Sequence, residues 1–128
     1  METLHNTACV LDIIEICGVG MCGRTCNVLA RTLHSELVRF VFEDVVECRS
    51  AGENTLAERA SNMEHLEEKT SCFLEIRNSE YIQYVNRQAS FSLPAEDLKD
   101  YIVFDWLGRV VEVVTSQSPR VIYSKADL

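Results

Sequence analysis

The spacing of apolar residues changes about halfway along the chain, and this change limits the folds that the sequence can adopt. Over residues 21–48 apolar side chains recur at steps of three and four, the period that lines one face of an α-helix. From residue 72 onward, short runs of β-branched and aromatic residues are separated by turn-forming residues, as in antiparallel strands. The sequence therefore predicts an α+β fold, in which N-terminal helices pack on a C-terminal antiparallel sheet.

The 128 residues suit one domain, with a helical half over about 5–71 and a strand-rich half over about 72–124. Within 21–48, the run 38–42 is rich in β-branched and aromatic residues and suits a strand equally well, so that part stays open. After a turn at 50–54, the spacing predicts a short amphipathic helix over about 56–71, which is favoured over a coiled coil.

The strand-rich half contains five candidate strands, at 72–77, 81–85, 101–106, 110–115 and 120–123. A tight turn at 107–109 predicts a hairpin, and the last three strands are expected to form an antiparallel meander. Residues 92–97 resemble the start of a helix whose length the sequence leaves open.

Charge and cysteine content narrow the expected partners and location. Twenty acidic and twelve basic residues give a net charge of −8, and no run of Lys or Arg favours nucleic acid as a partner. The start lacks the positive region of a signal peptide, and charged residues interrupt the apolar stretch 8–30, so we expect no membrane span. Six cysteines in such a chain predict reduced thiols in the cytoplasm or nucleus.

Residues 18–23 read G-V-G-M-C-G and match the G-x-G-x-x-G pattern of dinucleotide-binding domains. In that interpretation Gly18, Gly20 and Gly23 approach the phosphates of NAD or ATP, and Glu43 or Asp44 holds the ribose, within an α/β nucleotide-binding-like fold. Two carboxylates in the run 10–16 and the hairpins downstream argue against it. The competing interpretation is a glycine hinge between two elements.

A second hypothesis is a structural zinc site. His5 and Cys9 lie four residues apart, as do Cys22 and Cys26, so two helical turns could each offer two ligands. The C-x-x-C knuckles that most zinc modules carry do not occur in the sequence. Buried cysteine acting as a small hydrophobic residue is the competing interpretation.

Catalytic motifs of the G-x-S-x-G, H-E-x-x-H and G-x-x-x-x-G-K-[ST] types do not occur in the sequence, so an enzyme is the less expected class. The sequence instead predicts a protein-interaction or regulatory accessory module that binds a second copy of itself, as a homodimer, or a regulatory target. The alternatives are a nucleotide-binding protein and a zinc-binding regulatory protein. The expected interface residues are Leu56, Met63, Leu66, Tyr101 and Trp106, although the aromatic residues could instead fill the core.

Overall fold

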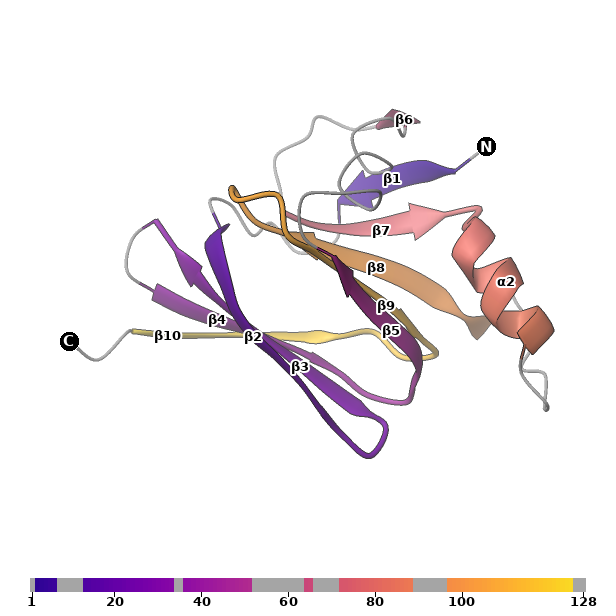
Figure 1. Ribbon diagram of the computed structural model, residues 1–128, viewed down its shortest axis with the longest axis horizontal. Coiled ribbons are helices and arrows are strands. Elements are labelled where there is room, and N and C mark those ends of the chain that lie inside the picture. Colours follow the sequence, from indigo (N-terminus) through magenta and orange to yellow (C-terminus); the bar gives the residue numbers. More distant parts are fainter. Residues whose placement is uncertain are drawn as a thin grey trace.

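Two β-sheets stacked face to face form the fold, and one helix packs on the outer face of the first sheet (Figure 1). The computed structural model describes residues 2–6, 13–33, 36–51, 64–65, 72–88 and 97–125. The strands are β1 (Thr3–Asn6), β2 (Ile13–Cys22), β3 (Thr25–Thr32), β4 (Glu36–Phe42), β5 (Val45–Ala51), β6 (Glu64–His65), β7 (Phe73–Arg77), β8 (Lys99–Phe104), β9 (Val110–Thr115) and β10 (Arg120–Lys125), and the helix is α2 (Glu80–Gln88).

The first sheet has the strand order β5-β9-β8-β7-β1-β6, and its neighbours are antiparallel except for the parallel pair β1 and β6. The second sheet has the order β10-β4-β3-β2 and is antiparallel throughout. Because β4 belongs to the second sheet and β5 to the first, the short turn between them carries the chain across the sandwich. The two ends of each sheet order identify β2, β10, β5 and β6 as edge strands.

The core lies between the two sheets and is built from alternate residues of the strands. Every second residue of β3 is buried, and the residues that β8 and β9 contribute to this core also alternate, Tyr101 with Val103 and Val111 with Val113. Phe73 lies among other aromatic rings, with its centroid 4.9 Å from that of Phe40 and 5.7 Å from that of Tyr101. Apolar burial of this kind on both inner faces is the main force that holds a sandwich together.

Helix α2 covers part of the outer face of the first sheet. Its residues Tyr81, Ile82 and Val85 pack with Val114 of β9. The hydroxyl oxygen of Ser79 accepts a hydrogen bond from the N–H of Ile82 at 3.1 Å, the usual contact of a serine cap at a helix start. Among the described residues no helix combines the length and the apolar character that crossing a membrane requires.

The α+β prediction is wrong, because the described residues of 21–48 form the end of β2, strands β3 and β4 and the start of β5. The side chains buried there alternate, as at Cys26, Val28 and Ala30. By contrast, Leu33 of the supposed helical face is 48% exposed, because the steps of three and four combined residues from two faces and a turn. The α/β alternative is also wrong, since the sheets are antiparallel rather than parallel.

Predictions for the second half fared unevenly. Four of the five strands are confirmed, as β7, β8, β9 and β10, and so is the hairpin that joins β8 to β9. Residues 81–85 are helical instead, and β10 leaves the expected meander to pair with β4. The expected helix over 56–71 lies outside the described residues, except that Glu64–His65 is a strand, and residues 92–96 also lie outside them.

Candidate functional site

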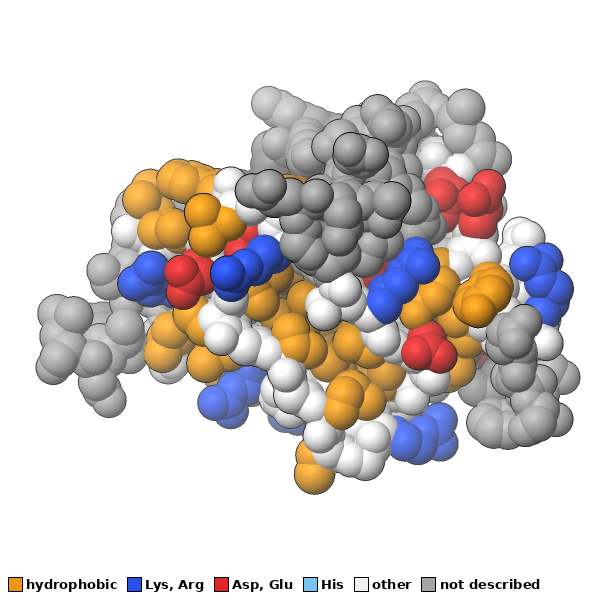
Figure 2. All heavy atoms as spheres, viewed as in Figure 1, with side chains coloured by type: hydrophobic (Ala, Val, Ile, Leu, Met, Phe, Trp, Pro, Cys, Tyr) orange, Lys and Arg blue, Asp and Glu red, His pale blue; other side chains and the backbone are white. Residues whose placement is uncertain are grey.

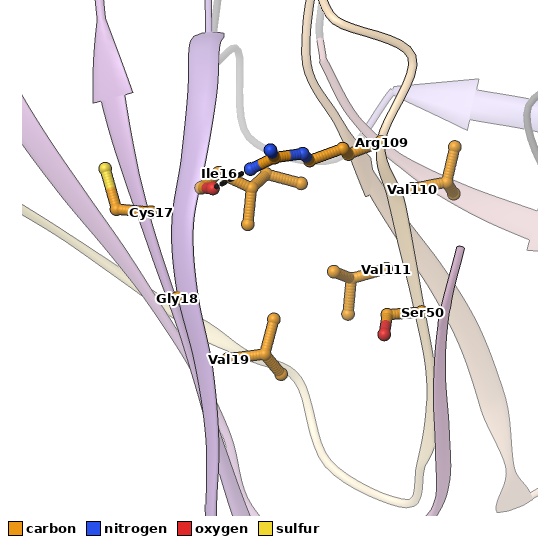
Figure 3. A pocket seen from close by; sticks show the side chains of 8 residues that line it. All are labelled: Ile16, Cys17, Gly18, Val19, Ser50, Arg109, Val110 and Val111. Atoms are coloured by element: carbon orange, nitrogen blue, oxygen red, sulfur yellow. Dashed lines mark hydrogen bonds between the residues drawn. The ribbon is translucent and has the colours of Figure 1, made fainter. Parts of the chain in front are cut away.

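A groove opens on one side of the sandwich, between edge strand β2 of the second sheet and strands β5 and β9 of the first (Figure 3). We call it the edge groove. Its volume is about 360 Å³, and it is lined by Ile16, Cys17, Gly18, Val19, Ser50, Arg109, Val110 and Val111. In the close view Val19 points across the groove toward Val111 and Ser50, whereas Cys17 points away from it (Figure 3). The walls are therefore mainly apolar, with Arg109 at one end.

The edge groove is bordered by two strands that each have one neighbour. Among the described residues, β2 pairs only with β3 and β5 only with β9. The hairpin from β2 to β3 turns at Gly23 and Arg24, and Gly23 has a φ of 61°, a left-handed conformation that glycine adopts without steric cost. The edge of β2 opposite β3 therefore has no neighbouring strand among the described residues.

The first part of this free side is closed by the turn between β8 and β9. The N–H of Ile16 donates to Asp105 Oδ2 at 2.9 Å, and Arg109 Nη1 donates to the Ile16 carbonyl at 3.2 Å. The N–H of Trp106 donates to the carbonyl of Ile13 at 3.0 Å. These contacts satisfy backbone groups that an edge strand would otherwise expose.

Asp105 holds the turn itself in shape. Its Oδ1 accepts hydrogen bonds from the backbone N–H groups of Leu107 and Arg109, both at 2.9 Å. Gly108 has a φ of 85°, which completes the turn. Asp105 is only 5% exposed. Its carboxylate both stabilises the turn of the hairpin and connects this turn to β2.

The rest of β2, residues 17–22, is exposed, and we call it the open edge. Val19 and Met21 are 41% and 52% exposed, although they pair with the fully buried Val28 and Cys26. No charged residue occurs between Glu15 and Arg24 in the sequence. In the space-filling view, hydrophobic and uncharged side chains lie along the lower part of the line that β2 follows in Figure 1, and charged ones lie to either side of it (Figure 2).

Natural edge strands are usually protected from pairing by lysine, proline or a bulge. The open edge contains neither lysine nor proline, and the second irregularity of β2, between Ile16 and Gly18, affects only its first residue, Cys17. From Gly18 to Cys22 the pairing with β3 is regular, so this part of the strand is extended and apolar. It has the features of a surface that pairs with another strand.

The glycines of the expected nucleotide site lie in a different setting from the one predicted. Gly18 and Gly20 are in β2 and Gly23 is in the hairpin turn, which leads into strand β3 rather than a helix. A Cβ atom on Gly18 or Gly20 would meet no heavy atom of the described structure within 4 Å. The helix N-terminus that would bind phosphates in a dinucleotide fold is therefore not supplied at this position.

The carboxylates predicted to hold the ribose lie in the turn between β4 and β5. Glu43 is 3.4 Å from the Arg120 guanidinium, and the Asp44 carboxylate accepts a hydrogen bond from the side chain of Gln117. The carbonyl of Arg24 accepts a hydrogen bond from the N–H of Val45 at 2.8 Å, which brings this turn beside the β2–β3 hairpin. Glu43 and Asp44 are thus held by residues at the start of β10 and in the turn before it.

The predicted zinc ligands are separated by the strands that carry them. His5 lies on β1, with Nε2 2.9 Å from the Thr3 hydroxyl. Cys22 is exposed at the end of β2, whereas Cys26 is buried and pairs with Met21, so the two cysteines lie on opposite faces. Cys9 lies outside the described residues, among which no cluster of three or more metal-ligating side chains occurs.

Cys26 instead contacts Cys48, a pairing that the sequence analysis did not predict. Its sulfur lies 3.8 Å from that of Cys48 on β5. This contact lowers the pKa of the Cys48 thiol, because the Cys26 S–H can donate to the thiolate. The same contact, together with burial, raises the pKa of Cys26.

Of the expected interface residues, Tyr101 is 3% exposed and belongs to the core, as the competing interpretation has it. Trp106 is 56% exposed on the turn that closes the start of β2. Leu56, Met63 and Leu66 lie outside the described residues. Sequence reasoning missed Val19, Asp105 and Arg109, and the alternation of glycine with apolar residues in 18–21 was the signal that could have identified the edge strand.

Comparisons with protein-family models, with curated proteins and with solved structures give no match to this chain.

Proposed function

We propose that the protein is a non-enzymatic interaction module of regulatory or accessory character, which associates with a second copy of itself by pairing along the open edge. The observation that carries the proposal is the open edge itself, an extended and uncharged strand segment with the exposed apolar side chains Val19 and Met21. Strand addition at such an edge gains affinity from main-chain hydrogen bonds and specificity from side chains that enter adjacent pockets. The edge groove supplies such a pocket beside Val19.

A second copy of the chain can pair with the main-chain hydrogen-bonding groups of the open edge, so no other partner is needed. Antiparallel pairing of two open edges joins the two four-stranded sheets into one continuous sheet across a two-fold axis. Val19 and Met21 of both copies then become covered together. An isologous contact of this kind forms a closed dimer, because each copy uses its one open edge on the other.

The charges that flank the open edge favour the antiparallel arrangement. The uncharged run is bounded by Glu15 at one end and Arg24 at the other. In an antiparallel pair, the Glu15 end of each strand lies beside the Arg24 turn of the other, so unlike charges meet at both ends. Glu15 also contacts Arg31 at 3.9 Å, and the side chain of Glu15 remains 38% exposed in this pair, so solvent reaches it.

The closed start of β2 restricts the register. Because Asp105 and Arg109 already occupy the backbone groups of Ile16, an incoming strand can pair only along residues 17–22. Because this segment is short, it can form only a few main-chain hydrogen bonds with an incoming strand. Contacts of a side chain in the edge groove must therefore add to the binding affinity. An extended segment of a regulatory target with an apolar side chain for the groove would use the same backbone groups.

The test is sedimentation equilibrium of the wild-type chain beside variants with Val19→Lys and Met21→Lys. A lysine on an edge strand opposes pairing because its charge must be desolvated. We expect a dimer whose dissociation constant rises at least about tenfold in each variant. The matched control is Ile122→Lys on β10, which is 43% exposed on the opposite edge of the same sheet and should leave the dimer intact.

Two results would overturn the proposal. One is a dimer that Ile122→Lys weakens while Val19→Lys and Met21→Lys leave it unchanged. The other is a wild-type chain that remains monomeric and also fails to bind a synthetic peptide with the sequence of residues 16–22. A monomer that binds this peptide, with the binding lost in Val19→Lys, would support strand addition with a target protein as the partner.

A further inference from the structure

Two cysteine side chains from opposite sheets meet between the layers of the sandwich. Cys26 lies on β3 of the second sheet and Cys48 on β5 of the first, 22 residues later. We infer that these two thiols form a site of reversible oxidation, at which a peroxide converts them into a disulfide that joins the two sheets. The inference is independent of the proposed self-association, since it rests on the thiol pair alone.

The distance between the sulfur atoms favours a disulfide. They are 3.8 Å apart, and a disulfide bond is about 2.05 Å long, so a small rotation of the side chains closes the gap. Each cysteine is held on a strand, Cys26 opposite Phe42 and Cys48 opposite Val113, and both of these partner residues belong to the core. The strands therefore keep the two thiols facing each other.

The two thiols differ in exposure and in pKa, and these differences assign them different roles in the oxidation. Cys48 is partly exposed, and its pKa is lowered by the hydrogen bond from Cys26. Cys26 is fully buried, and its pKa is raised by the same contact and by burial. Thiolate character and access determine which cysteine reacts first, so Cys48 is the attacking thiol and Cys26 the resolving one.

The reaction balances with hydrogen peroxide as the oxidant. The Cys48 thiolate attacks one peroxide oxygen, the O–O bond breaks, and the released hydroxide takes a proton to give water and a sulfenic acid on Cys48. The Cys26 sulfur then attacks the sulfenic sulfur, the S–O bond breaks, and a second water leaves as the S–S bond forms. In sum, two thiols and one peroxide give one disulfide and two waters, and a dithiol reductant reverses the change.

The crosslink would lie directly behind the open side of the sandwich. Met21 of the open edge pairs with Cys26, and Ser50, which lines the edge groove, is two residues beyond Cys48. A bond between β3 and β5 ties together the two sheets whose edges form the groove. Oxidation should therefore stabilise this side of the fold against separation of the layers.

The experiment treats the full chain with hydrogen peroxide and maps its peptides without reduction. We expect the number of free thiols, counted after unfolding, to fall from six to four, with one crosslinked peptide pair that contains Cys26 and Cys48. The melting temperature should rise by about 5 °C or more and return after dithiothreitol. Cys26→Ser should leave a sulfenic acid on Cys48 that dimedone traps, and the double change Cys17→Ser with Cys22→Ser should preserve the crosslink.

The wild-type peptide map decides the matter even if Cys26→Ser fails to fold. A map in which Cys17 or Cys22 is oxidised while Cys26 and Cys48 remain thiols would overturn the inference. A crosslink between two chains, or between Cys48 and any cysteine other than Cys26, would also overturn it. Because these readouts do not involve the dimer, their failure is distinguishable from failure of the self-association.

Discussion

The carboxylate of Asp105 accepts a hydrogen bond from the backbone N–H of Ile16 at 2.9 Å, although Ile16 lies 89 residues earlier in the chain. This contact fastens the hairpin of one sheet to the edge strand of the other. It also divides β2 into a closed part and an open edge, because the backbone groups beyond Ile16 face no such turn. If the protein associates along the open edge as proposed, this buried carboxylate limits the pairing to the residues beyond Ile16.

Replacing Asp105 tests this relationship. Asparagine keeps one acceptor oxygen but places an NH₂ group where the second oxygen stood, so a backbone N–H of Ile16, or those of Leu107 and Arg109, would face a donor. We expect Asp105→Asn to lower the free energy of unfolding by about 2 kcal/mol, as measured by urea denaturation.

The matched control for that change is Asp97→Asn, because Asp97 is exposed. It should leave the midpoint of unfolding within error of the wild type. A midpoint for Asp105→Asn equal to that of the control would show that the turn does not depend on the carboxylate.

The strands of the second half could be predicted because their residue types leave little alternative. Val110–Thr115 is almost entirely β-branched, and all six of its side chains are buried, as expected of a central strand covered on both faces. Residues 81–85 carry similar residue types but form a helix. The helix is favoured there by the cap at Ser79 and by the spacing of Tyr81, Ile82 and Val85 along one face. The residue types alone do not distinguish this helix from a strand.

The first half failed because apolar residues at steps of three and four also arise when strands and turns follow one another. Cys26 and Leu29 seemed to share one helical face, yet Cys26 faces the core and Leu29 lies on the other face of β3. The hypothesis of a glycine-rich site did select residues 18–23, although these residues form the end of an edge strand and a hairpin turn rather than a loop that leads into a helix. The contact of Asp105 with Ile16 joins residues that are 89 positions apart, and no local pattern encodes it.

An ion pair under helix α2 gives a second stability prediction. Arg49 on β5 contacts the fully buried carboxylate of Glu112 at 2.6 Å, and its guanidinium lies 3.7 Å from the centre of the Tyr81 ring. Arg49→Met removes this cation from a buried carboxylate, and we expect the free energy of unfolding to fall by about 2–3 kcal/mol in urea denaturation.

Adding Glu112→Leu to Arg49→Met should recover most of that loss, since the buried charge is then gone. Arg39→Met, at an exposed position of β4, is the matched control and should change little. Equal losses in the single and double variants would contradict an electrostatic origin.

Alkaline pH should weaken the packing of α2. Burial raises the pKa of the Tyr81 hydroxyl, and nearby Glu47 raises it further. A tyrosine whose pKa is higher in the folded state stabilises the protein fully below its unfolded pKa of about 10, and this contribution is lost as pH rises beyond that value. We expect urea midpoints to fall as pH rises above about 10, and to fall less in Tyr81→Phe. An identical pH dependence in the two proteins would exclude Tyr81 as the cause.

Valine at Gly20 and valine at Gly23 should change the free energy of unfolding in opposite directions. A side chain on Gly20 meets no described heavy atom within 4 Å, and its φ is not positive, so Gly20→Val should raise the free energy of unfolding by about 0.5 kcal/mol. Gly23 has a φ of 61°, where valine is strained, so Gly23→Val should lower it by about 1–2 kcal/mol.

Urea denaturation of both variants at low protein concentration, where association contributes least, measures the difference. A thermal-shift assay with NAD and ATP on the same samples adds a second criterion. If Gly20 serves only as a strand residue, its valine variant gains stability and neither nucleotide shifts the wild type. If Gly20→Val instead abolished a nucleotide-induced shift of the wild type, the glycine would be serving a ligand, and the open edge would need to be reconsidered as a binding site for phosphate rather than for a strand.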